Sequence, residues 1–434
     1  MKKSWSRRRF LSRTAAAAGA PMVLPASALG RDGAVAPSNR IVMGCIGTGG
    51  QGTFNLKAFL GDPDTRVAAV CDVDAKHRDQ ARDLVNEKYG GRDCRTYSDF
   101  RELLARPEID AVTVCTPDHW HGLIAIAAAK AGKDIYCEKP LTNSIAEGRA
   151  LVSAVRRYGR ILQTGTHERS RPNARYACEL VRNGRIGRLQ TIRANMPCTD
   201  AHHLDILGDK APHPPMTVPP ELDWNLWLGH TPAVAYTARR CHFYWRFILD
   251  YGGGEMTDRG AHILDIGQLG NHTDDTTPVE YQAKGVVPES DLYNTFFNYN
   301  FECRYANGVR LIGTTAEPRG IRFEGSEGWI FIYIHGGNLE ASSPALLKEI
   351  IRPEEIQLGR SPGHQRDFIQ CVKSRREPMA PVEVGHHSAT ICHLLNIAMV
   401  TGRKLRWDPA GEKVLGDEVA QSMTSRPMRS PWRL

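Results

Sequence analysis

The sequence lacks the patterns that mark a metal-binding or disulfide-rich protein. None of its eleven cysteines forms a Cys-x-x-Cys pair, and no cysteine–histidine spacing indicates a metal site, so we predict no bound metal. Four of the cysteines lie in or beside apolar runs, and we interpret most of them as small buried hydrophobes. No internal repeat or low-complexity segment is evident in the 434 residues.

No apolar run is long enough to span a bilayer, although the N-terminus has the order of an export signal. Residues 6–11 read SRRRFL, which fits the twin-arginine pattern. An alanine-rich stretch interrupted by Arg13 and two prolines follows, and the small residues 26–28 suit a signal peptidase. The alternatives are a disordered basic tail or a membrane anchor. We predict a leader over 1–28, export by the twin-arginine machinery and a periplasmic or otherwise exported protein without a membrane anchor.

The excess of positive charge is confined to this leader. Six basic and no acidic residues lie in 1–28, so the net charge of +8 falls to +2 for the rest of the chain. A nearly neutral body gives no electrostatic reason for a polyanionic partner, and we expect no nucleic acid. The twin-arginine route carries folded proteins, so a cofactor could travel inside the protein.

Apolar runs alternate with helical segments in the first part of the chain. The runs are 40–47, 66–73, 109–116, 133–139 and 160–165, and the helical segments are 51–60, 76–89, 99–105, 122–131 and 144–158. Continuously apolar strands that alternate with helices predict a doubly wound parallel sheet, the α/β Rossmann class. We therefore place a linker at 29–39 and a nucleotide-binding domain at 40–165.

The regular alternation of strands and helices does not continue in residues 166–434. A helix at 171–184 and a strand at 188–196 precede a long loop at 197–220. Consecutive strands then follow at 279–287, 293–303, 308–317, 320–327 and 328–334, and two helices at 365–374 and 386–401. This order predicts an α+β C-terminal domain with a large, mostly antiparallel open sheet.

A glycine-rich turn directly follows the first strand and opens a helix. It has the pattern GxGxxG and consists of Gly47, Thr48, Gly49, Gly50, Gln51 and Gly52. In this context the backbone can approach a pyrophosphate closely at the positive helix end. Asp72, twenty residues after Gly52, is placed to bind a ribose 2′-hydroxyl and to repel a 2′-phosphate. The pattern predicts bound NAD, with NADP less favoured; the alternative is a glycine turn without a ligand.

Two further motifs end predicted core strands, where open α/β sheets bind ligands. CTPDHWHG occupies 115–122 and CEKPLT occupies 137–142. They supply candidate cofactor-binding residues: Thr116, Pro117, His119, His121, Glu138 and Lys139. His119 and His121 could line the reactive end of the cofactor or only begin a helix, and Lys139 could be a solvated lysine.

A third motif, 250–267, contains Asp258, His262 and Asp265, which share one face if the segment is helical. A carboxylate beside an imidazole orients it and raises its basicity, which suits a general base. Many helices carry such a pair merely as a surface interaction.

These blocks occur in the order found in the Gfo/Idh/MocA oxidoreductases, and nearly all of the chain after the leader resembles that family. The resemblance rests on IGTGGQG, VCDVD, TPDHWH, CEKPLT and WRFILDYGGGEMTDRGAHILDIGQ. It implies a Rossmann domain, a C-terminal sheet that packs in a homo-oligomer, and a catalytic set of Lys139, Asp258 and His262. His262 would take a hydroxyl proton, Asp258 would orient His262, and Lys139 would stabilise the developing alkoxide.

Residues near the ends of this predicted cleft are candidates for binding a sugar. They are His167, Arg169, Tyr244, Trp245, Arg246 and Asp265. Aromatic rings stack on sugar faces, although Tyr244 and Trp245 could equally pack in the core.

Export would prevent free NADH from being reoxidised, so we expect the nucleotide to stay tightly bound. The favoured function is an NAD-dependent oxidoreductase that acts on a carbohydrate or polyol hydroxyl and reduces a second carbonyl compound. The alternative is an NAD-dependent glycoside hydrolase or lyase that works through a transient keto-sugar, for which His119, His121 or His167 could supply another acid or base. A non-catalytic sugar- or nucleotide-binding protein is a third possibility, against which the intact Lys139, Asp258 and His262 argue.

Overall fold

The computed structural model describes residues 35–434. The predicted leader, 1–28, and the first six residues of the predicted linker lie outside the described part. A short 3-10 helix, η2 (Pro37–Asn39), precedes the first strand. Between residues 35 and 434, no helix combines the length and the apolar character needed to cross a bilayer.

The first sheet is parallel and six-stranded, as the alternating pattern predicted. Its strands are β1 (Ile41–Ile46), β2 (Thr65–Cys71), β3 (Arg95–Tyr97), β4 (Ala111–Val114), β5 (Asp134–Cys137) and β6 (Leu162–Thr164). They are ordered β3-β2-β1-β4-β5-β6. The short edge strand β3 gave no apolar run because its residues are largely exposed. The order reverses between β1 and β4, which is where such sheets open a crevice for ligands.

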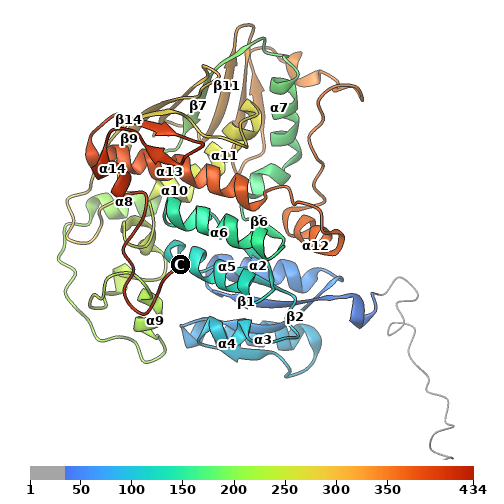
Figure 1. Ribbon diagram of the computed structural model, residues 1–434, viewed down its shortest axis with the longest axis vertical. Helices are drawn as coiled ribbons and strands as arrows, with labels where there is room; N and C mark the ends of the chain where they lie inside the picture. The colour runs from blue at the N-terminus through green and yellow to red at the C-terminus, as the bar shows by residue number, and fades with distance from the viewer. Residues whose placement is uncertain (1–34) are drawn as a thin grey trace, which may run out of the picture. The chain divides into compact units, whose positions relative to one another are not determined.

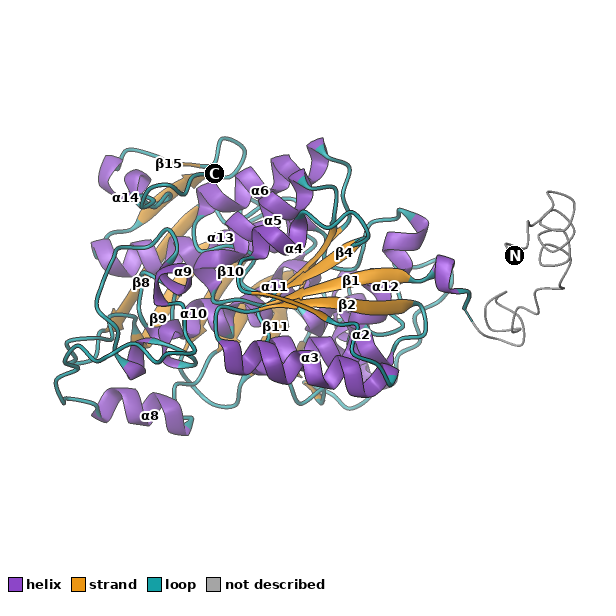
Figure 2. Cartoon of the chain, turned by 90° about the horizontal axis from the view of Figure 1, so that it is seen from below, coloured by secondary structure: helices purple, strands orange, loops and turns teal. Residues whose placement is uncertain are grey.

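Helices cover both faces of this sheet (Figure 2). One face packs against α2 (Gly50–Gly61), α3 (Ala75–Tyr89) and α12 (His364–Ser374), and the other against α4 (Phe100–Leu104), α5 (Asp118–Lys130) and α6 (Ile145–Arg157). Helix α12 comes from the second half of the chain, and its Phe368 meets the rings of Phe59 and Tyr136 edge to face. Both faces of every central strand are therefore buried, which explains their continuous apolar sequences.

The second sheet has nine strands and is mostly antiparallel (Figure 1). Its strands are β7 (Leu189–Asn195), β8 (Glu280–Val286), β9 (Phe297–Arg304), β10 (Arg310–Thr314), β11 (Gly320–Gly325), β12 (Trp329–Tyr333), β13 (Leu339–Ala341), β14 (Leu405–Asp408) and β15 (Lys413–Val414). The order is β13-β12-β11-β7-β10-β9-β8-β14-β15, and the one parallel pair within it joins β7 to β10. The predicted α+β architecture of this half is confirmed.

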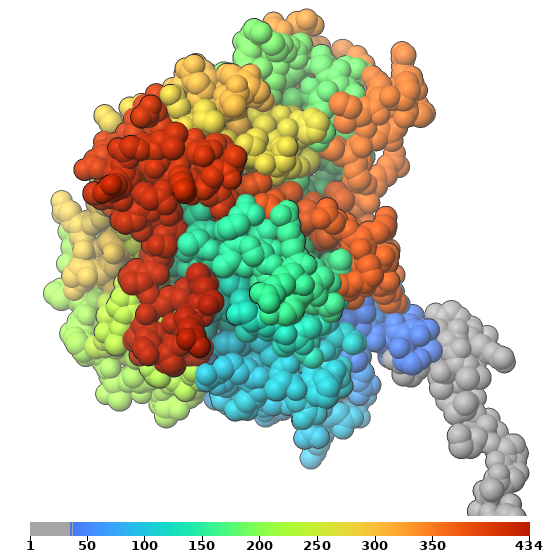
Figure 3. Space-filling view, in the orientation of Figure 1, coloured from blue at the N-terminus to red at the C-terminus, as the bar shows by residue number. Residues whose placement is uncertain are grey.

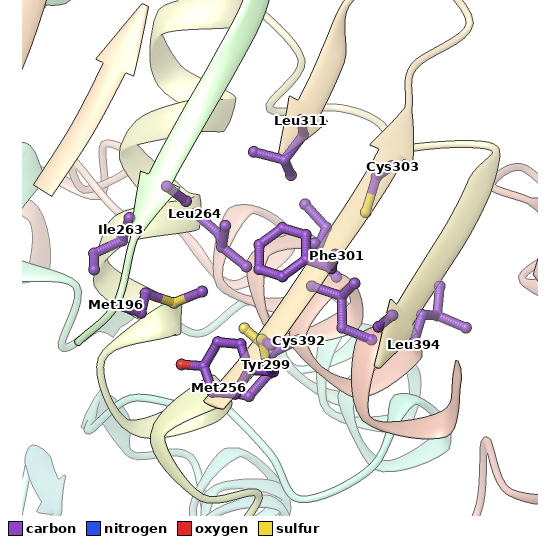
Figure 4. Close-up of a cluster of buried hydrophobic side chains, with 14 of the residues drawn as sticks. Met196, Met256, Ile263, Leu264, Tyr299, Phe301, Cys303, Leu311, Cys392 and Leu394 are labelled. Atoms are coloured by element: carbon purple, nitrogen blue, oxygen red, sulfur yellow. The ribbon is translucent and has the colours of Figure 1, made fainter. Parts of the chain in front are cut away.

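One face of this sheet holds the core, and the other carries polar side chains. Helices α7 (Pro172–Arg182), α11 (Gly260–Asn271) and α13 (Val382–Thr401) pack on the inner face. Figure 4 shows part of this core, where Leu264 of α11 lies beside Phe301 of the sheet and Ile263 lies near Met196. On the outer face, ion pairs such as Arg193–Glu324 cross between strands. Packing of Ile263 and Leu264 in this core fixes the rotation of α11 about its axis, although every residue of the helix is buried.

Shorter elements connect these layers. They are η3 (His167–Ser170), α8 (Ala201–Gly208), α9 (Trp224–Leu228), η4 (Ala238–Arg240), η5 (Tyr244–Phe247), α10 (Glu255–Asp258), η6 (Leu346–Lys348) and α14 (Glu418–Ser422). Helix α8 lies within the predicted loop 197–220, which is therefore not wholly irregular. All eleven cysteines are free, and nine of them are buried.

Candidate functional site

A pocket of about 600 Å³ lies at the carboxyl ends of the parallel strands. This volume is within the rough range of 300–1,000 Å³ typical of small-molecule sites. The Rossmann half contributes the glycine turn, Asp72 and Lys139 to its wall, and the second half contributes Arg246 and His262. Both halves of the chain therefore face one cavity.

The glycine turn has the backbone conformation that only glycine adopts easily. Gly47 has φ +78°, and a Cβ there would lie 2.6 Å from the backbone of Cys115. A Cβ on Gly52 would lie 1.9 Å from the carbonyl oxygen of Gly47. Gly49, Gly50 and Gln51 line the pocket at the start of α2, where unpaired N–H groups favour an anion. Gly52 is not part of the lining, and its lack of a side chain allows α2 to pack closely against the turn at Gly47.

Asp72 lies at the end of β2 and lines the same pocket. Its Oδ2 accepts a 2.7 Å hydrogen bond from the backbone N–H of Thr48, and its Oδ1 accepts one of 2.9 Å from Asp74. Burial raises the pKa of the Asp72 carboxyl, and these hydrogen bonds oppose the rise. Thr48 does not line the pocket, so its role is to join Asp72 to the glycine turn. The open cradle above Gly50 and the carboxylate of Asp72 fit a dinucleotide without a 2′-phosphate.

The motif after β5 is tied to the glycine helix. Oε1 of Glu138 accepts hydrogen bonds from Gln51 at 3.0 Å and from Asn55 at 2.8 Å. Glu138 lines the pocket, as do Thr116 and Pro117 at the start of α5. His121 also lines it, with Nδ1 2.7 Å from the carbonyl oxygen of Pro140 and Nε2 2.9 Å from that of Thr116. These contacts hold the ends of β4 and β5 and the start of α2 in one fixed wall.

Lys139 reaches across the pocket to the second half of the chain. Its Nζ donates to Oδ1 of Asp258 at 2.5 Å and to the carbonyl oxygen of Asp258 at 2.8 Å. Arg246 lies 3.4 Å from the same carboxylate. These cations hold the pKa of Asp258 well below its usual range despite burial. Asp258 is therefore an anion that positions Lys139.

Asp258 does not orient His262, contrary to the prediction from the sequence. Asp258 ends α10 and His262 lies in α11, with Arg259 between the two helices. The Asp258 carboxylate is taken by Lys139, and the buried Nδ1 of His262 has no hydrogen-bond partner. Burial, with the nearby His167 and Lys139, lowers the pKa of His262 well below the usual histidine value instead of raising it. His262 is therefore a neutral imidazole that lines the pocket.

Of the candidate sugar-binding residues, His167, Trp245 and Arg246 line the pocket. The guanidinium carbon of Arg246 lies 4.4 Å from the ring centre of Trp245, which fixes the arginine beside the aromatic face. Tyr244 is not in the lining, because its hydroxyl donates to Asp205 at 2.6 Å. The prediction of Tyr244 as a sugar-binding residue is therefore not supported.

Three other candidates lie outside the lining and have structural roles. Arg169 pairs with Asp265 at 2.7 Å, and both side chains are buried. Arg169 also forms an ion pair with Asp274, so two carboxylates contact this one guanidinium. The ring of His119 is fully buried, with Nε2 2.9 Å from the carbonyl oxygen of Trp227. Sequence motifs alone did not separate these buried network residues from residues that face the cavity.

Several lining residues were not among the predicted site residues. They are His77, Asp118, His202, Trp227, His242 and His335. Asp118 follows the predicted residue Pro117, so its position in the motif was the one available hint. Burial raises the pKa of the Asp118 carboxyl well above its ordinary value. His335 lies in the turn after β12 at φ +67°, and no motif surrounds it.

The C-terminal segment braces the pocket from outside. The Arg429 guanidinium donates to the carbonyl oxygen of Gly229, at 2.6 Å for Nη2, next to α9. The ring of Trp432 meets that of Trp120 edge to face at 4.8 Å and stacks on Phe100 at 6.3 Å. Trp120 and Phe100 line the pocket. Figure 3 shows this red segment between the yellow-green and teal parts of the surface.

Comparison with known protein families gives two matches that together span most of the described chain. Residues 41–166 match the family described as "Oxidoreductase family, NAD-binding Rossmann fold". Residues 179–434 match "Oxidoreductase family, C-terminal alpha/beta domain". The first match contains all six strands of the parallel sheet.

Individual relatives match over shorter stretches. The myo-inositol 2-dehydrogenase of Thermotoga maritima is 34% identical over 151 residues, which is 35% of this chain and 43% of that protein. A glycosyl hydrolase family 109 protein of Saccharopolyspora erythraea is 33% identical over 159 residues, 32% of this chain and 34% of that protein. The chain thus spans less than half the length of these curated relatives. The aldose-aldose oxidoreductase of Caulobacter crescentus, solved with glycerol, shares the fold, with a TM-score of 0.58 and 20% identity over 85% of this chain and 99% of that one.

Proposed function

We propose that this chain, which belongs to the Gfo/Idh/MocA oxidoreductase family and contains its NAD-binding Rossmann domain, oxidises a hydroxyl of a carbohydrate or polyol with bound NAD. Bound NAD would accept a hydride from the substrate carbon. The glycine turn, Asp72 and Glu138 would hold the nucleotide, while Lys139 and His262 would act on the substrate oxygen.

One observation carries this proposal: a cation from the Rossmann half and a neutral imidazole from the other half line the same cavity as the glycine turn. Lys139 follows β5, and His262 lies in α11. A protein that only bound a nucleotide would need neither group at this position. A hydroxyl oxygen that lay between them would face an ammonium on one side and an unprotonated base on the other.

The chain's own residues can then share the work of proton removal. Burial lowers the pKa of His262, so its ring is unprotonated, and as a residue that lines the pocket it can accept the hydroxyl proton. The ammonium of Lys139 stabilises the negative charge that develops on the oxygen. Asp258 holds Lys139 in place through two contacts. Trp245 and Arg246 offer a stacking face and a hydrogen-bond donor to a polyol.

We also propose that the nucleotide stays bound throughout the cycle. The brace made by Arg429 and Trp432 joins the outside of α5 to α9 and restrains two walls of the pocket. Retention of the nucleotide would suit an exported enzyme, because released NADH would not be reoxidised outside the cell. Reduction of a second carbonyl compound in the same site would regenerate the bound NAD after each oxidation. We further propose that the protein is exported by the twin-arginine route and that it forms a homo-oligomer through the open sheet.

The test uses the protein as purified. Denaturation should release NAD or NADH, which mass spectrometry identifies, and pairs of aldoses should give equal amounts of aldonate and alditol without added cofactor. Lys139→Ala and His262→Ala should each lower turnover by at least about 10²-fold and keep the nucleotide. Lys57→Ala and His272→Asn, which change exposed residues, serve as controls. Full activity in either pocket variant would refute the role assigned to that residue.

A second candidate is an NAD-dependent glycoside hydrolase or lyase that works through a transient keto-sugar. It is supported by the carboxyl of Asp118, which lines the pocket and whose pKa burial raises, so that the protonated form is favoured. A protonated carboxyl there could act as a general acid toward a leaving group. The similarity to a glycosyl hydrolase family 109 protein points the same way. Release of nitrophenol from p-nitrophenyl glycosides, lost after borohydride treatment and in Asp118→Asn, would favour this candidate over the first.

A further inference from the structure

Three histidines from separate segments meet at one end of the pocket. His167 lies in η3, His262 in α11 and His335 in the turn after β12. Their ring centres are 4.6 Å apart for His167 and His262, 5.1 Å for His262 and His335, and 5.6 Å for His167 and His335. One nitrogen from each ring lies within 4.8 Å of the other two. The cluster is thus compact enough to bind a single ion.

The lone pairs of this cluster are largely unused. No residue between 35 and 434 makes a hydrogen bond to the ring of His262 or His335. Only 3% of His262 is exposed, so water cannot replace the missing partner of its buried Nδ1. Nε2 of His167 lies 3.3 Å from Oε1 of the buried Glu168. A buried imidazole without a partner is costly, so the arrangement calls for a ligand.

The charges around the cluster allow a cation. Lys139 is paired with Asp258, and Arg319 with Asp200 at 3.0 Å. The carboxylate of Glu168, which Arg171 approaches at 3.8 Å, is the acidic group that faces the cluster at short range. A carboxylate behind a ligating imidazole is the arrangement that orients histidines on zinc.

We propose that His167, His262 and His335 form a site for a divalent transition-metal ion of the zinc class, with Glu168 as the outer carboxylate. Three histidines leave one coordination position open, and it would face the pocket that all three residues line. Metal–nitrogen bonds of about 2.0–2.1 Å would draw the three nitrogens to roughly 3.3 Å from one another. His335 is exposed on a turn and can make that movement.

In two other clusters of similar composition, the groups that could bind an ion are already engaged by neighbouring residues. In the cluster of Asp74, His77 and His242, Oδ1 of Asp74 accepts hydrogen bonds from the N–H groups that open α3. In the cluster of Asp200, His202 and His203, the histidine His203 is bonded to Glu255 and Asp200 is paired with two arginines. These clusters therefore serve as internal controls.

Binding of the ion and the base role of His262 exclude each other, because both use the imidazole lone pair. This consequence rests on the proposed function. Zinc should therefore inhibit turnover in competition with substrate, and a chelator should restore it.

The test of binding does not depend on activity. Metal-stripped protein is titrated with Co²⁺, and the visible d–d bands and the bound cobalt per chain are recorded. One equivalent in a tetrahedral imidazole environment is expected, without the intense near-ultraviolet bands of cobalt–thiolate bonds. His335→Asn should lower the affinity at least tenfold, and asparagine tolerates the positive φ at this position.

The matched control is His242→Asn, which also replaces an exposed histidine at positive φ but belongs to another cluster. It should bind Co²⁺ like the unmodified protein. Failure of the unmodified protein to bind cobalt, equal loss in both variants, or full binding by a correctly folded His335→Asn would each overturn the proposal. Circular dichroism and nucleotide content establish folding. Absence of sugar turnover would count against the proposed function alone and leave the cobalt result valid.

Discussion

Nζ of Lys139 lies 2.5 Å from Oδ1 of Asp258, so the acid of the Asp-x-x-x-His motif pairs with the lysine and not with the histidine four residues on. This contact joins the end of β5 to the end of α10 and closes the pocket between the two halves of the chain. It makes Asp258 a positioning residue for a cation and leaves His262 neutral and unpaired.

The first prediction follows from this pairing. Lys139→Ala should lower kcat by about 10²–10³-fold, the range seen when one stabilising donor to an oxyanion is removed. Asp258→Asn should also slow turnover, but the double variant should be no slower than Lys139→Ala alone, because Asp258 acts through the lysine. Steady-state kinetics of the three variants decide this. Multiplied losses in the double variant would show that Asp258 acts on another group, such as His262.

A second prediction concerns the choice of dinucleotide. Asp72 is a half-buried carboxylate at the position expected to meet a ribose 2′-hydroxyl, and a 2′-phosphate there would meet its charge. Asp72→Ser should weaken NAD binding by about 1.5–3 kcal/mol and raise the share of NADP in the protein as purified. Mass spectrometry of the released nucleotide gives the ratio. Asp83→Asn, on the exposed side of α3, is the control, and an unchanged ratio in Asp72→Ser would contradict the assignment.

The C-terminal brace leads to a third prediction. Trp432→Ala removes the ring that packs on Trp120 and Phe100, so it should cost about 1 kcal/mol of stability and speed the loss of nucleotide during dialysis. Arg433→Ala changes the exposed neighbour and should do neither. Equal retention of nucleotide in the two variants would show that the brace does not restrain the pocket.

Buried histidines predict how stability depends on pH. Burial lowers the pKa of His230 and of His393 to about 4, whereas the unfolded chain has values of about 6.5. Between these values the unfolded chain binds more protons, so the free energy of unfolding falls as the pH falls, by up to about 1.4 kcal/mol per pH unit for each histidine. Urea unfolding at a series of pH values measures the slope. His393→Gln should flatten it and His272→Asn should not; a flat profile for the unmodified protein would contradict the prediction.

The sequence predicted the fold better than the site, for physical reasons. Parallel strands buried on both faces have continuous apolar runs, and the glycine turn requires Gly47 at positive φ, so both features can be recognised locally. Side-chain partners are decided by distant segments. Nothing near Asp258 indicates that Lys139 will take its carboxylate, and nothing near Arg169 indicates its burial against Asp265.

His335 is a residue of the pocket that could not be selected from the sequence. It lies in a turn 73 residues after His262 and 168 after His167, and the three rings meet in the folded chain because η3 and the turn after β12 both lie beside α11. The expectation of no metal was based on spacing along the chain, which does not detect a cluster of this kind.

The central claim is that Lys139 and His262 act on one substrate carbon beside the bound nucleotide. The most direct measurement is single-turnover reduction of the nucleotide that copurifies with the protein, followed by its near-ultraviolet absorbance after addition of a sugar or polyol. We expect rapid reduction in the unmodified protein and in His272→Asn, and reduction at least about 10²-fold slower in His262→Ala and in Lys139→Ala at equal nucleotide content. Reduction at the unmodified rate in either pocket variant, or a protein that carries no nucleotide and binds none, would contradict the account.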